Sequence, residues 1–503
     1  MTTSAGAADR PRSAGGVLTL ALALLLVLMI SLFAWYAHPF TADFPWLWRT
    51  GVWILEHRAL PTSDPFSWTH QGEPWLLYQW LFEVVVAAIA AVVGLKGLFA
   101  LYQSAAIGLY VIAPLTFAVP RQIGPMQVLP GAIFAMMLAP YNLSLRPMIA
   151  SSALLLAQHV LVHRWRADQV SWKATVLLVG LFYLLWSNLH MGVTIGFASL
   201  LLFALGDALE RHKIYQFAPA DPAVEGTAQP LRAYAVLIGM AVLASLLNPY
   251  GIGLYKYLWT LSTAGGMNGH IEELQSPNFH GGMPQFWLLF VTLTFGLIAT
   301  TGMRRSISAA DLFHLVATVL ATFFAARFSV WSLLMLSLVL PRVLHHRAAL
   351  AGGAGNASGM RVTLGRVSLI AAILIPAGLW LGPWAPPLDP ACTPLKPGIA
   401  ALDAARRSED RLLNSPNFGS CMIFATPASR PFIDTRFDMY GEDFVLDTAS
   451  LLTLHPGWQE LLKKRGITLV ALERGLPLTE ALLADGRYQI VFTDRGSALI
   501  RLR

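Results

Sequence analysis

The sequence predicts a multi-spanning α-helical membrane protein that ends in a small α/β domain. Hydrophobic residues make up 55% of its 503 residues and charged residues only 13%, whereas roughly one quarter of the residues of a soluble domain are charged. The apolar residues come in long runs, and short clusters of Lys and Arg lie between the runs. This pattern excludes a soluble enzyme. It also explains the net charge of +7 by the positive-inside rule, so nucleic acid is not an expected partner.

The first predicted span is Val17 to Tyr36, which follows a cytoplasmic tail of residues 1–16. A run of about twenty apolar residues crosses a hydrocarbon core of roughly 30 Å. The basic flank at Arg10 and Arg12 resembles the start of a signal peptide, but the apolar run is long for one and no small-residue cleavage motif follows. We therefore expect this helix to be retained.

Ten further apolar runs follow, which gives about eleven transmembrane helices. The basic clusters between them face the cytoplasm only if Trp80 to Val93 is a non-spanning helix or a re-entrant segment. The predicted transmembrane domain is 17–384, with a first outer loop at 37–96. The ten runs are Gly97 to Val119, Met126 to Ala139, Met148 to Val162, Ala174 to Trp186, Val193 to Leu209, Ala233 to Leu247, Phe286 to Thr300, Ala309 to Phe324, Ser329 to Leu340 and Val367 to Trp384.

This topology puts the N-terminus in the cytoplasm and residues 385–503 on the outer side, as a soluble periplasmic α/β domain. Short β-rich runs alternate there with helical stretches such as Gly457 to Lys464. The chain has two cysteines, Cys392 and Cys421, which allow one disulfide and exclude a cysteine-rich metal site. Whether they form a bridge is left open by the sequence. The expected strands are Cys421 to Ala425, Pro431 to Asp434, Ile467 to Leu472, Tyr488 to Phe492 and Ala498 to Leu502.

One carboxylate, Asp43, lies at the predicted water boundary directly after the first span. Asp is a preferred N-cap, and Pro45 suits the first turn of the helix that follows, so capping is one explanation. The other is catalytic: a carboxylate beside a lipid phosphate can accept a proton from an acceptor hydroxyl while a nearby arginine neutralises the phosphate. Both explanations stay open.

The residues around Asp43 are similar to a motif of bacterial GT-C membrane glycosyltransferases, including the dolichyl-phosphate-mannose-protein mannosyltransferase-like proteins. The family pattern is an acid pair, then aromatics, then R-T-G-x-W-I-L-E-H, and here Arg49 begins Arg-Thr-Gly-Val-Trp-Ile-Leu-Glu-His. Further matches are spread over nearly the whole chain: Leu60 to Thr69, Pro74-Trp75, Arg146-Pro147, Trp186 to His190, Leu247 to Gly251, Gln275 to His280, Phe432 to Gly441 and Pro456 to Trp458.

The resemblance implies an enzyme of the bacterial inner membrane that transfers a sugar from a polyprenyl-phosphate carrier on the periplasmic face. The acceptor would be a lipid, a glycan or a protein. At the positions that match the family motifs, the resemblance makes Asp43 the candidate catalytic base. It makes Arg49 and Arg146 candidate partners of the donor phosphate. His190 and His280 are candidate substrate contacts at the mouth of the site. The expected partners are the lipid-linked sugar donor, membrane lipids and an envelope glycan or glycoprotein acceptor.

The chain departs from the family pattern at three polar places. Thr41 replaces the first acid, Leu47 replaces a histidine, and Tyr78-Gln79 replaces a His-Glu pair. We therefore expect no metal and no cofactor besides the donor substrate. The departures also keep two alternatives open, a non-catalytic assembly protein of an envelope polysaccharide system and a transporter of a lipid-linked glycan.

In the terminal domain, Asp434, Arg436 and Asp438 alternate along a predicted strand. Such alternation describes either a binding site or the ordinary solvated face of a strand, because successive side chains point to opposite sides. The sequence favours the solvated face.

Overall fold

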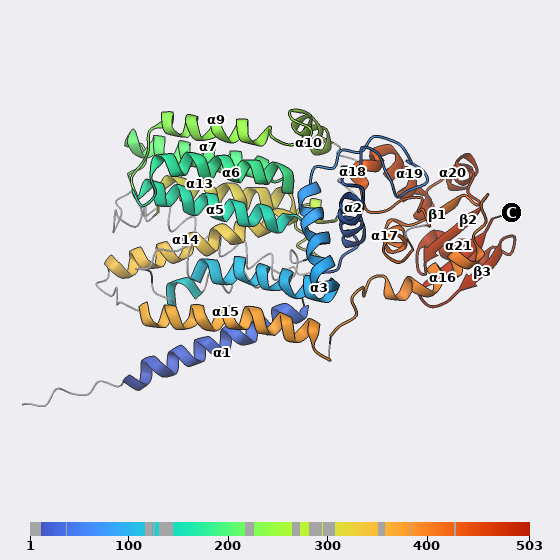
Figure 1. The fold of residues 1–503 in the computed structure, drawn as a ribbon, viewed down its shortest axis with the longest axis horizontal. Helices are drawn as coiled ribbons and strands as arrows, with labels where there is room; N and C mark the ends of the chain where they lie inside the picture. Colours follow the sequence, from blue (N-terminus) through green and yellow to red (C-terminus); the bar gives the residue numbers. More distant parts are fainter. Residues whose placement is uncertain are drawn as a thin grey trace, which may run out of the picture.

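The computed structural model is a helical bundle with an α/β domain at one end (Figure 1). It describes residues 12–36, 38–115, 123, 126–129, 144–216, 226–263, 272–280, 294, 307–350, 358–383, 385–426 and 429–502. The expected spans at Met126 to Ala139 and Phe286 to Thr300 lie mostly outside the described residues, as do the ends of those predicted to finish at Val119 and Trp384.

In the part of the chain that the structure describes, nine helices run roughly side by side along the bundle (Figure 1). Six helical stretches in the described part of the chain are long and apolar enough to cross a membrane, and two more apolar helices, α9 and α13, are shorter. These findings support a membrane fold, whereas the count of about eleven spans stays a prediction. The nine helices are α1 (Arg12–Tyr36), α3 (Trp80–Ile107, continued by the π-helical turn η1, Gly108–Ile112), α5 (Met148–Arg166), α6 (Trp172–Leu189), α7 (Val193–Arg211), α9 (Leu231–Ser245), α13 (Ala309–Phe324), α14 (Ser329–Leu350) and α15 (Ser358–Leu381).

The bundle has a packed interior and an apolar exterior. Trp186, Tyr183 and Phe203 are fully buried between the helices. Large apolar side chains also stay exposed along the outside, among them Leu24 and Leu28 of α1 and Leu201 of α7. Exposed apolar surface over several helices is costly in water and favourable in lipid, which agrees with the composition.

Helix α3 changes direction at Gly94. Its backbone there has φ 72° and ψ 172°, a left-handed extended conformation that glycine adopts without a side-chain clash. The first half of α3 lies across the end of the bundle, and the second half runs along it (Figure 1). The break separates Trp80 to Val93 from the span that the sequence places from Gly97 onward.

Helix α2 (Phe44–His57) lies against the first half of α3 and also crosses the end of the bundle (Figure 1). The contact is close at Gly51, where an added Cβ atom would lie 2.0 Å from the carbonyl oxygen of Glu83. Only glycine fits there, which gives the glycine of the Arg-Thr-Gly motif a packing role. Helix α10 (Gly253–Thr263) and the 3₁₀ turns η4 (Glu272–Leu274) and η5 (Ala326–Phe328) complete the described parts of this bundle.

The C-terminal domain contains a four-stranded sheet in the order β1-β2-β4-β3, with β1 parallel to β2 and the other pairs antiparallel. Its elements are η6 (Thr393–Leu395), α16 (Lys396–Ala405), β1 (Leu412–Asn414), α17 (Pro416–Ala425), α18 (Phe437–Tyr440), α19 (Glu442–Leu452), α20 (Trp458–Arg465), β2 (Leu469–Glu473), α21 (Pro477–Ala484), β3 (Gln489–Thr493) and β4 (Ser497–Arg501).

Three of the five expected strands are present, as β2, β3 and β4, and two expectations are wrong. Cys421 to Ala425 belongs to α17, which Ser415 caps by accepting a hydrogen bond from the Phe418 N–H. Pro431 to Asp434 is irregular. The short parallel strand β1 was not expected, and the helix expected at Gly457 to Lys464 is confirmed as α20.

The domain shares a core with the bundle end. One cluster of buried side chains continues from Phe44 and Phe99, through Trp380, to Phe418 of the domain. A disulfide between Cys392 and Cys421, with Cα atoms 5.3 Å apart, lies in the same cluster. The domain is therefore fixed to the bundle by apolar packing, and its orientation relative to α2 is defined.

Candidate functional site

The carboxylate of Asp43 lies at the bundle end, just before α2. Its side chain makes no capping hydrogen bond to the helix, although Pro45 occupies the first turn as expected. Instead one carboxylate oxygen, Oδ2, lies 3.0 Å from Nη2 of Arg146. The structure thus brings together the predicted base and one predicted phosphate partner, and it gives Asp43 no part in capping.

Arg146 is held in place from two directions. It directly precedes α5, and the neighbouring Leu145 N–H donates to the carbonyl of Pro39, 2.7 Å away, which ties this turn to the end of α1. On its other side Arg146 Nη1 lies 2.6 Å from both carboxylate oxygens of Glu273 in η4. One guanidinium therefore joins two carboxylates, and we call Asp43, Arg146 and Glu273 the outer cluster.

The outer cluster is half-buried. The side chains of Asp43, Arg146 and Glu273 are 24%, 26% and 32% exposed. Burial lowers the pKa of Arg146, but the charges of Asp43 and Glu273 outweigh burial and raise it above its ordinary value, so the guanidinium stays charged. Its Nε has no hydrogen-bond partner among the described residues. A charged donor is thus available beside two carboxylates.

Tyr78 connects the outer cluster to the C-terminal domain. Burial raises the pKa of its hydroxyl, and the carboxylates of Asp438, Glu83 and Asp43 raise it further, while Arg327 opposes them. The ring of Tyr78 also faces that of Tyr257, with centroids 6.0 Å apart. Groups from the first loop, from η5 and from the domain therefore converge on one tyrosine.

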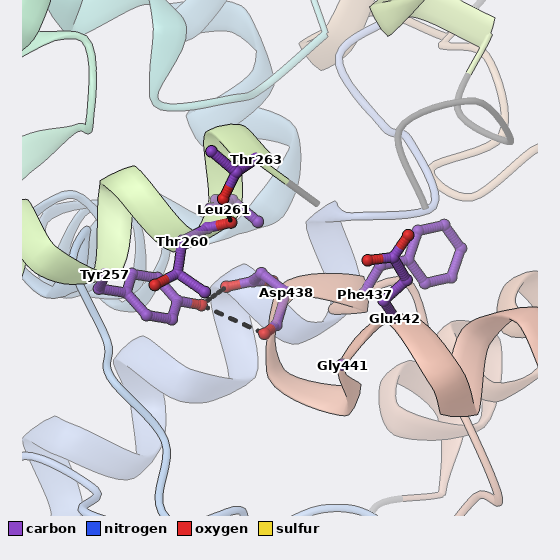
Figure 2. A pocket seen from close by; sticks show the side chains of 8 residues that line it. All are labelled: Tyr257, Thr260, Leu261, Thr263, Phe437, Asp438, Gly441 and Glu442. Atoms are coloured by element: carbon purple, nitrogen blue, oxygen red, sulfur yellow. Dashed lines mark hydrogen bonds between the residues drawn. The ribbon is translucent and has the colours of Figure 1, made fainter. Parts of the chain in front are cut away.

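A pocket of about 270 Å³ opens between α10 and the C-terminal domain (Figure 2). The hydroxyl of Tyr257 donates to Oδ2 of Asp438 at 2.8 Å, and burial raises the pKa of this carboxyl group despite that hydrogen bond. The lining combines aromatic, hydroxyl and carboxyl groups, which suits a polar ligand with an apolar face. The lining residues are Tyr257, Thr260, Leu261, Thr263, Phe437, Asp438, Gly441 and Glu442.

Arg49, the other predicted phosphate partner, binds the C-terminal domain. Its guanidinium donates to the backbone carbonyls of Ile423 and Phe424, each at 3.3 Å, at the end of α17. It also lies over the ring of Trp48, 4.6 Å from the centroid. Carbonyl groups at the end of a helix carry partial negative charge, so Arg49 has a docking role in this structure.

The two predicted histidines differ in their surroundings. His190 is buried in the turn between α6 and α7, where its Nδ1 lies 2.7 Å from Ser151 Oγ and accepts from the Gly192 N–H. Burial lowers its pKa to about 3, with a further contribution from Arg327, so it is neutral. His280 is exposed at the end of a described segment. Among the described residues, neither histidine contacts the outer cluster, and their roles stay predictions.

Asp434 and Arg436 are fully buried, so the expectation of a solvated strand face is wrong. Arg436 donates to both oxygens of Asp434, from Nε at 2.8 Å and from Nη2 at 2.6 Å, and its Nη1 donates to Asp64 of the first loop at 2.8 Å. All three side chains are 0% exposed. We call Asp64, Arg436 and Asp434 the buried clamp, because it joins the loop to the domain.

Sequence reasoning missed Glu273 and Tyr257 as candidates for the site, and it favoured a solvated strand face for Asp438. Glu273 directly precedes the Gln275 to His280 motif, and Asp438 lies within the Phe432 to Gly441 motif, so both were next to recognised signals. Tyr257 carried no local signal. Its proximity to Asp438 depends on long-range folding, because 181 residues separate them.

Comparisons with known proteins point to one fold. No family profile matches the chain, and no curated protein matches it in sequence. The structure is similar to the archaeal oligosaccharyltransferase AglB from Archaeoglobus fulgidus in complex with an inhibitory peptide and a dolichol-phosphate, with a TM-score of 0.50 and 13% identity, over 91% of this chain and 69% of that one. The apo form of the Archaeoglobus fulgidus oligosaccharyltransferase has a TM-score of 0.49 and 11% identity, over 90% and 69%. The first likeness shows that this chain has the GT-C fold.

Proposed function

We propose that this protein is a glycosyltransferase that moves a sugar from a polyprenyl-phosphate carrier to a lipid, glycan or protein acceptor. The observation that carries the proposal is the outer cluster, in which Asp43 and Arg146 meet at the end of a GT-C bundle beside an open pocket. The similar AglB structure holds a dolichol-phosphate and a peptide, which are a lipid phosphate and a candidate acceptor class.

In the proposed reaction Asp43 is the general base. It accepts the proton of an acceptor hydroxyl while the hydroxyl oxygen forms a bond to C1 of the donor sugar. The bond between C1 and the phosphate oxygen breaks, and the electron pair leaves with the polyprenyl phosphate. That leaving group gains negative charge, which needs a fixed cation at the boundary of the membrane.

Arg146 supplies that cation. Its Nε, which has no partner in the described part of the chain, can donate to a phosphate oxygen while Nη2 keeps its contact with Asp43. The planar fork of arginine suits a phosphate, and it holds the base at a fixed distance from the leaving group. Glu273 orients the guanidinium from the other side. Arg49, whose donors face carbonyl groups of α17, serves to dock the domain.

The pocket between α10 and α18 is the proposed acceptor site. Tyr257 of α10 and Asp438 of α18 meet at this pocket through a hydrogen bond (Figure 2), and the ring of Tyr78 lies 6.0 Å from that of Tyr257. An acceptor held there lies on the same side of the bundle as the outer cluster.

The proposed topology places residues 385–503 on the periplasmic side of a bacterial inner membrane and residues 1–16 in the cytoplasm, with 17–384 as the membrane domain. The disulfide between Cys392 and Cys421 supports this orientation, because such bonds persist in oxidising compartments. Reporter fusions after Arg166 and after Arg503 test it, and a cytoplasmic signal from the Arg503 fusion would contradict it.

The experiment that tests the function compares lipid-linked sugars in membranes of a deletion strain complemented with wild type or with variants. Asp43→Asn keeps the size of the side chain and removes the base, so transfer should fall by about 10²- to 10⁴-fold and one polyprenyl-phosphate sugar should accumulate. Arg146→Gln should behave alike. Asp447→Asn is the matched control, because Asp447 also pairs with an arginine, Arg465, on the surface of the domain.

All variants are compared at equal membrane abundance, measured by immunoblot. Full rescue by Asp43→Asn would overturn the assignment of the base and would favour the non-catalytic assembly protein or the transporter. Accumulation of no lipid-linked sugar in the deletion strain would overturn the choice of donor.

A further inference from the structure

A second polar cluster lies inside the bundle, at the helix ends that point away from the C-terminal domain. His159 and His163 are four residues apart on α5, so they lie on the same face of that helix. Asp311, in the first turn of α13, faces them. The three residues are buried, with exposed fractions of 0%, 5% and 3%. Among the described residues, this group has the composition and the spacing of a metal site.

The distances fit the ligand shell of a small divalent ion. Oδ1 of Asp311 lies 3.0 Å from Nε2 of His163 and 3.4 Å from Nε2 of His159. The three ligand atoms all lie within 4.8 Å of one another. Two ligand atoms that each lie about 2.0–2.1 Å from a tetrahedral Zn²⁺ are about 3.3 Å apart. The distances from Asp311 to the two histidine nitrogens are already close to this separation.

His159 is poorly satisfied among the described residues. Its Nδ1 is buried without a partner, and the one contact of its Nε2 is with Oδ1 of Asp311, at 3.4 Å. A buried polar group without a full hydrogen bond destabilises the fold. A metal ion would use the lone pair of Nε2, which gives this otherwise unfavourable side chain a partner.

The charges around the cluster leave room for a cation. Arg342 Nη1 contacts Oδ2 of Asp311 at 3.0 Å, and Arg166 pairs with Asp207 and Glu210 of α7 nearby. Arg166 interacts electrostatically with Asp207, Glu210 and Asp311, and Asp311 in turn pairs with Arg342. Three carboxylates against two guanidinium groups give a formal charge of −1 when the histidines are neutral. Buried excess charge is costly unless it is compensated.

We propose that His159, His163 and Asp311 bind one divalent transition-metal ion of the Zn²⁺ class, with water as a fourth ligand. Two imidazoles and one carboxylate suit Zn²⁺, Co²⁺ or Ni²⁺ better than Mg²⁺ or Ca²⁺. The ion joins α5 to α13, and Arg342 orients two of the ligands from outside the ligand set, because its Nη1 lies 3.0 Å from Asp311 Oδ2 and 3.0 Å from His163 Nε2. The site is separate from the outer cluster, so this inference does not depend on the proposed function.

The chain provides a matched control in His314. Its ring lies 5.1 Å from that of His159 and is equally buried. Both of its nitrogens have partners, Nε2 with Ser199 Oγ at 2.9 Å and Nδ1 with the Ala310 carbonyl at 2.7 Å. His314 is therefore a neighbour of the site and not a ligand.

The test uses the full chain purified in detergent with an affinity tag that contains no histidine. After treatment with a chelator, Co²⁺ is titrated and the visible d–d absorption of tetrahedral Co²⁺ is recorded, and Zn²⁺ content is measured by mass spectrometry after dialysis. We expect one equivalent of metal in wild type and in His314→Gln. Loss of one ligand in His159→Gln or Asp311→Asn should weaken binding by at least about 10- to 100-fold.

Wild type is measured first, so the result does not depend on whether the variants fold. Substoichiometric metal together with an unchanged thermal unfolding temperature on adding Zn²⁺ would overturn the proposal and leave a histidine–aspartate hydrogen-bonded pair. Equal binding by wild type, His159→Gln and Asp311→Asn would place the ion elsewhere and also overturn it. A Zn²⁺-dependent rise in unfolding temperature in wild type and in His314→Gln, absent in His159→Gln, supports it.

Discussion

The outer cluster and the buried clamp contain the same chemistry in two different environments. Each has one arginine between two carboxylates, Arg146 between Asp43 and Glu273, and Arg436 between Asp64 and Asp434. Side chains of the first are about one quarter to one third exposed, and those of the second are 0% exposed.

The partners differ accordingly. In the buried clamp, Asp64 also accepts hydrogen bonds from the N–H groups of Phe66 and Ser67, and Asp434 accepts one from the Tyr440 hydroxyl. In the outer cluster, Nε of Arg146 has no partner in the described residues. The same residue types thus form a saturated contact in the buried clamp, and a cluster with one buried, unpaired N–H group in the partly exposed outer cluster.

Arg436→Leu tests the structural half of this comparison and should have the largest effect on stability. Removing one member of a buried ion pair leaves uncompensated carboxylates and costs about 3–5 kcal/mol. The docking of the domain should weaken, which limited proteolysis of purified protein in increasing urea measures. Arg474→Leu, which removes an exposed pair with Glu480, is the control and should leave the urea midpoint unchanged. Equal midpoints for wild type and Arg436→Leu would contradict a structural role.

Removing the disulfide tests how much the covalent bond stabilises the domain, separately from the ion pairs of the buried clamp. Replacing Cys392 and Cys421 by serine opens a loop of 29 residues, and the entropy of that loop in the unfolded chain corresponds to roughly 3–4 kcal/mol. The same proteolysis assay should show a lower urea midpoint for the double variant, with reduced wild type as its control. If the midpoint does not move, the buried clamp and the apolar core hold the domain without the bridge.

The response to pH should distinguish the two clusters. Burial alone would raise the pKa of Asp64, but Arg436 and the hydrogen bonds outweigh burial and hold the pKa below its ordinary value. A carboxyl group whose pKa is lower in the folded protein than in the unfolded chain stabilises the fold at any pH above its unfolded-state pKa. This stabilisation is lost as the pH falls through the folded-state pKa. The advantage of wild type over Asp64→Asn should therefore be constant near neutral pH and shrink below about pH 4. A constant difference down to pH 2.5 in urea titrations would exclude ionised Asp64 as its source.

Glu273→Gln should have the smallest effect on stability. Because the pair with Arg146 is partly exposed, its loss should cost no more than about 1 kcal/mol, measured by the same urea titration. Sugar transfer should nevertheless decrease, since Arg146 loses one of its two supports. A destabilisation as large as that of Arg436→Leu would show that the outer cluster is itself a structural clamp.

The sequence predicted the parts of this fold that depend on local patterns. Apolar runs gave most of the bundle helices, and the short run from Trp80 to Val93 was separated from the following span because of the charge balance. The apolar run from Cys421 to Ala425 predicts a strand, but α17 forms there because Ser415 and Pro416, which precede the run, start a helix.

The site was predictable where a motif marked it and not where folding alone creates it. Asp43 and Arg146 come from separate motifs, and the structure places their side chains 3.0 Å apart, while their catalytic roles stay predictions. Arg436 was predicted to be exposed to solvent. Its partner Asp64 is 372 residues away, and a local sequence pattern cannot indicate such a long-range contact. Arg49 matched the motif, but its partners are backbone carbonyls of α17, which a sequence comparison does not reveal.

The distance along the chain between Asp64 and Arg436 has a consequence for biosynthesis. Translation proceeds at roughly 5–20 residues per second, so the first loop emerges about 20–70 seconds before the arginine that neutralises it. During that interval the Asp64 carboxylate lacks its arginine partner and has only the N–H groups of Phe66 and Ser67 in its own loop as donors. The first loop therefore carries an uncompensated charge until the C-terminal domain is synthesised and the buried clamp forms.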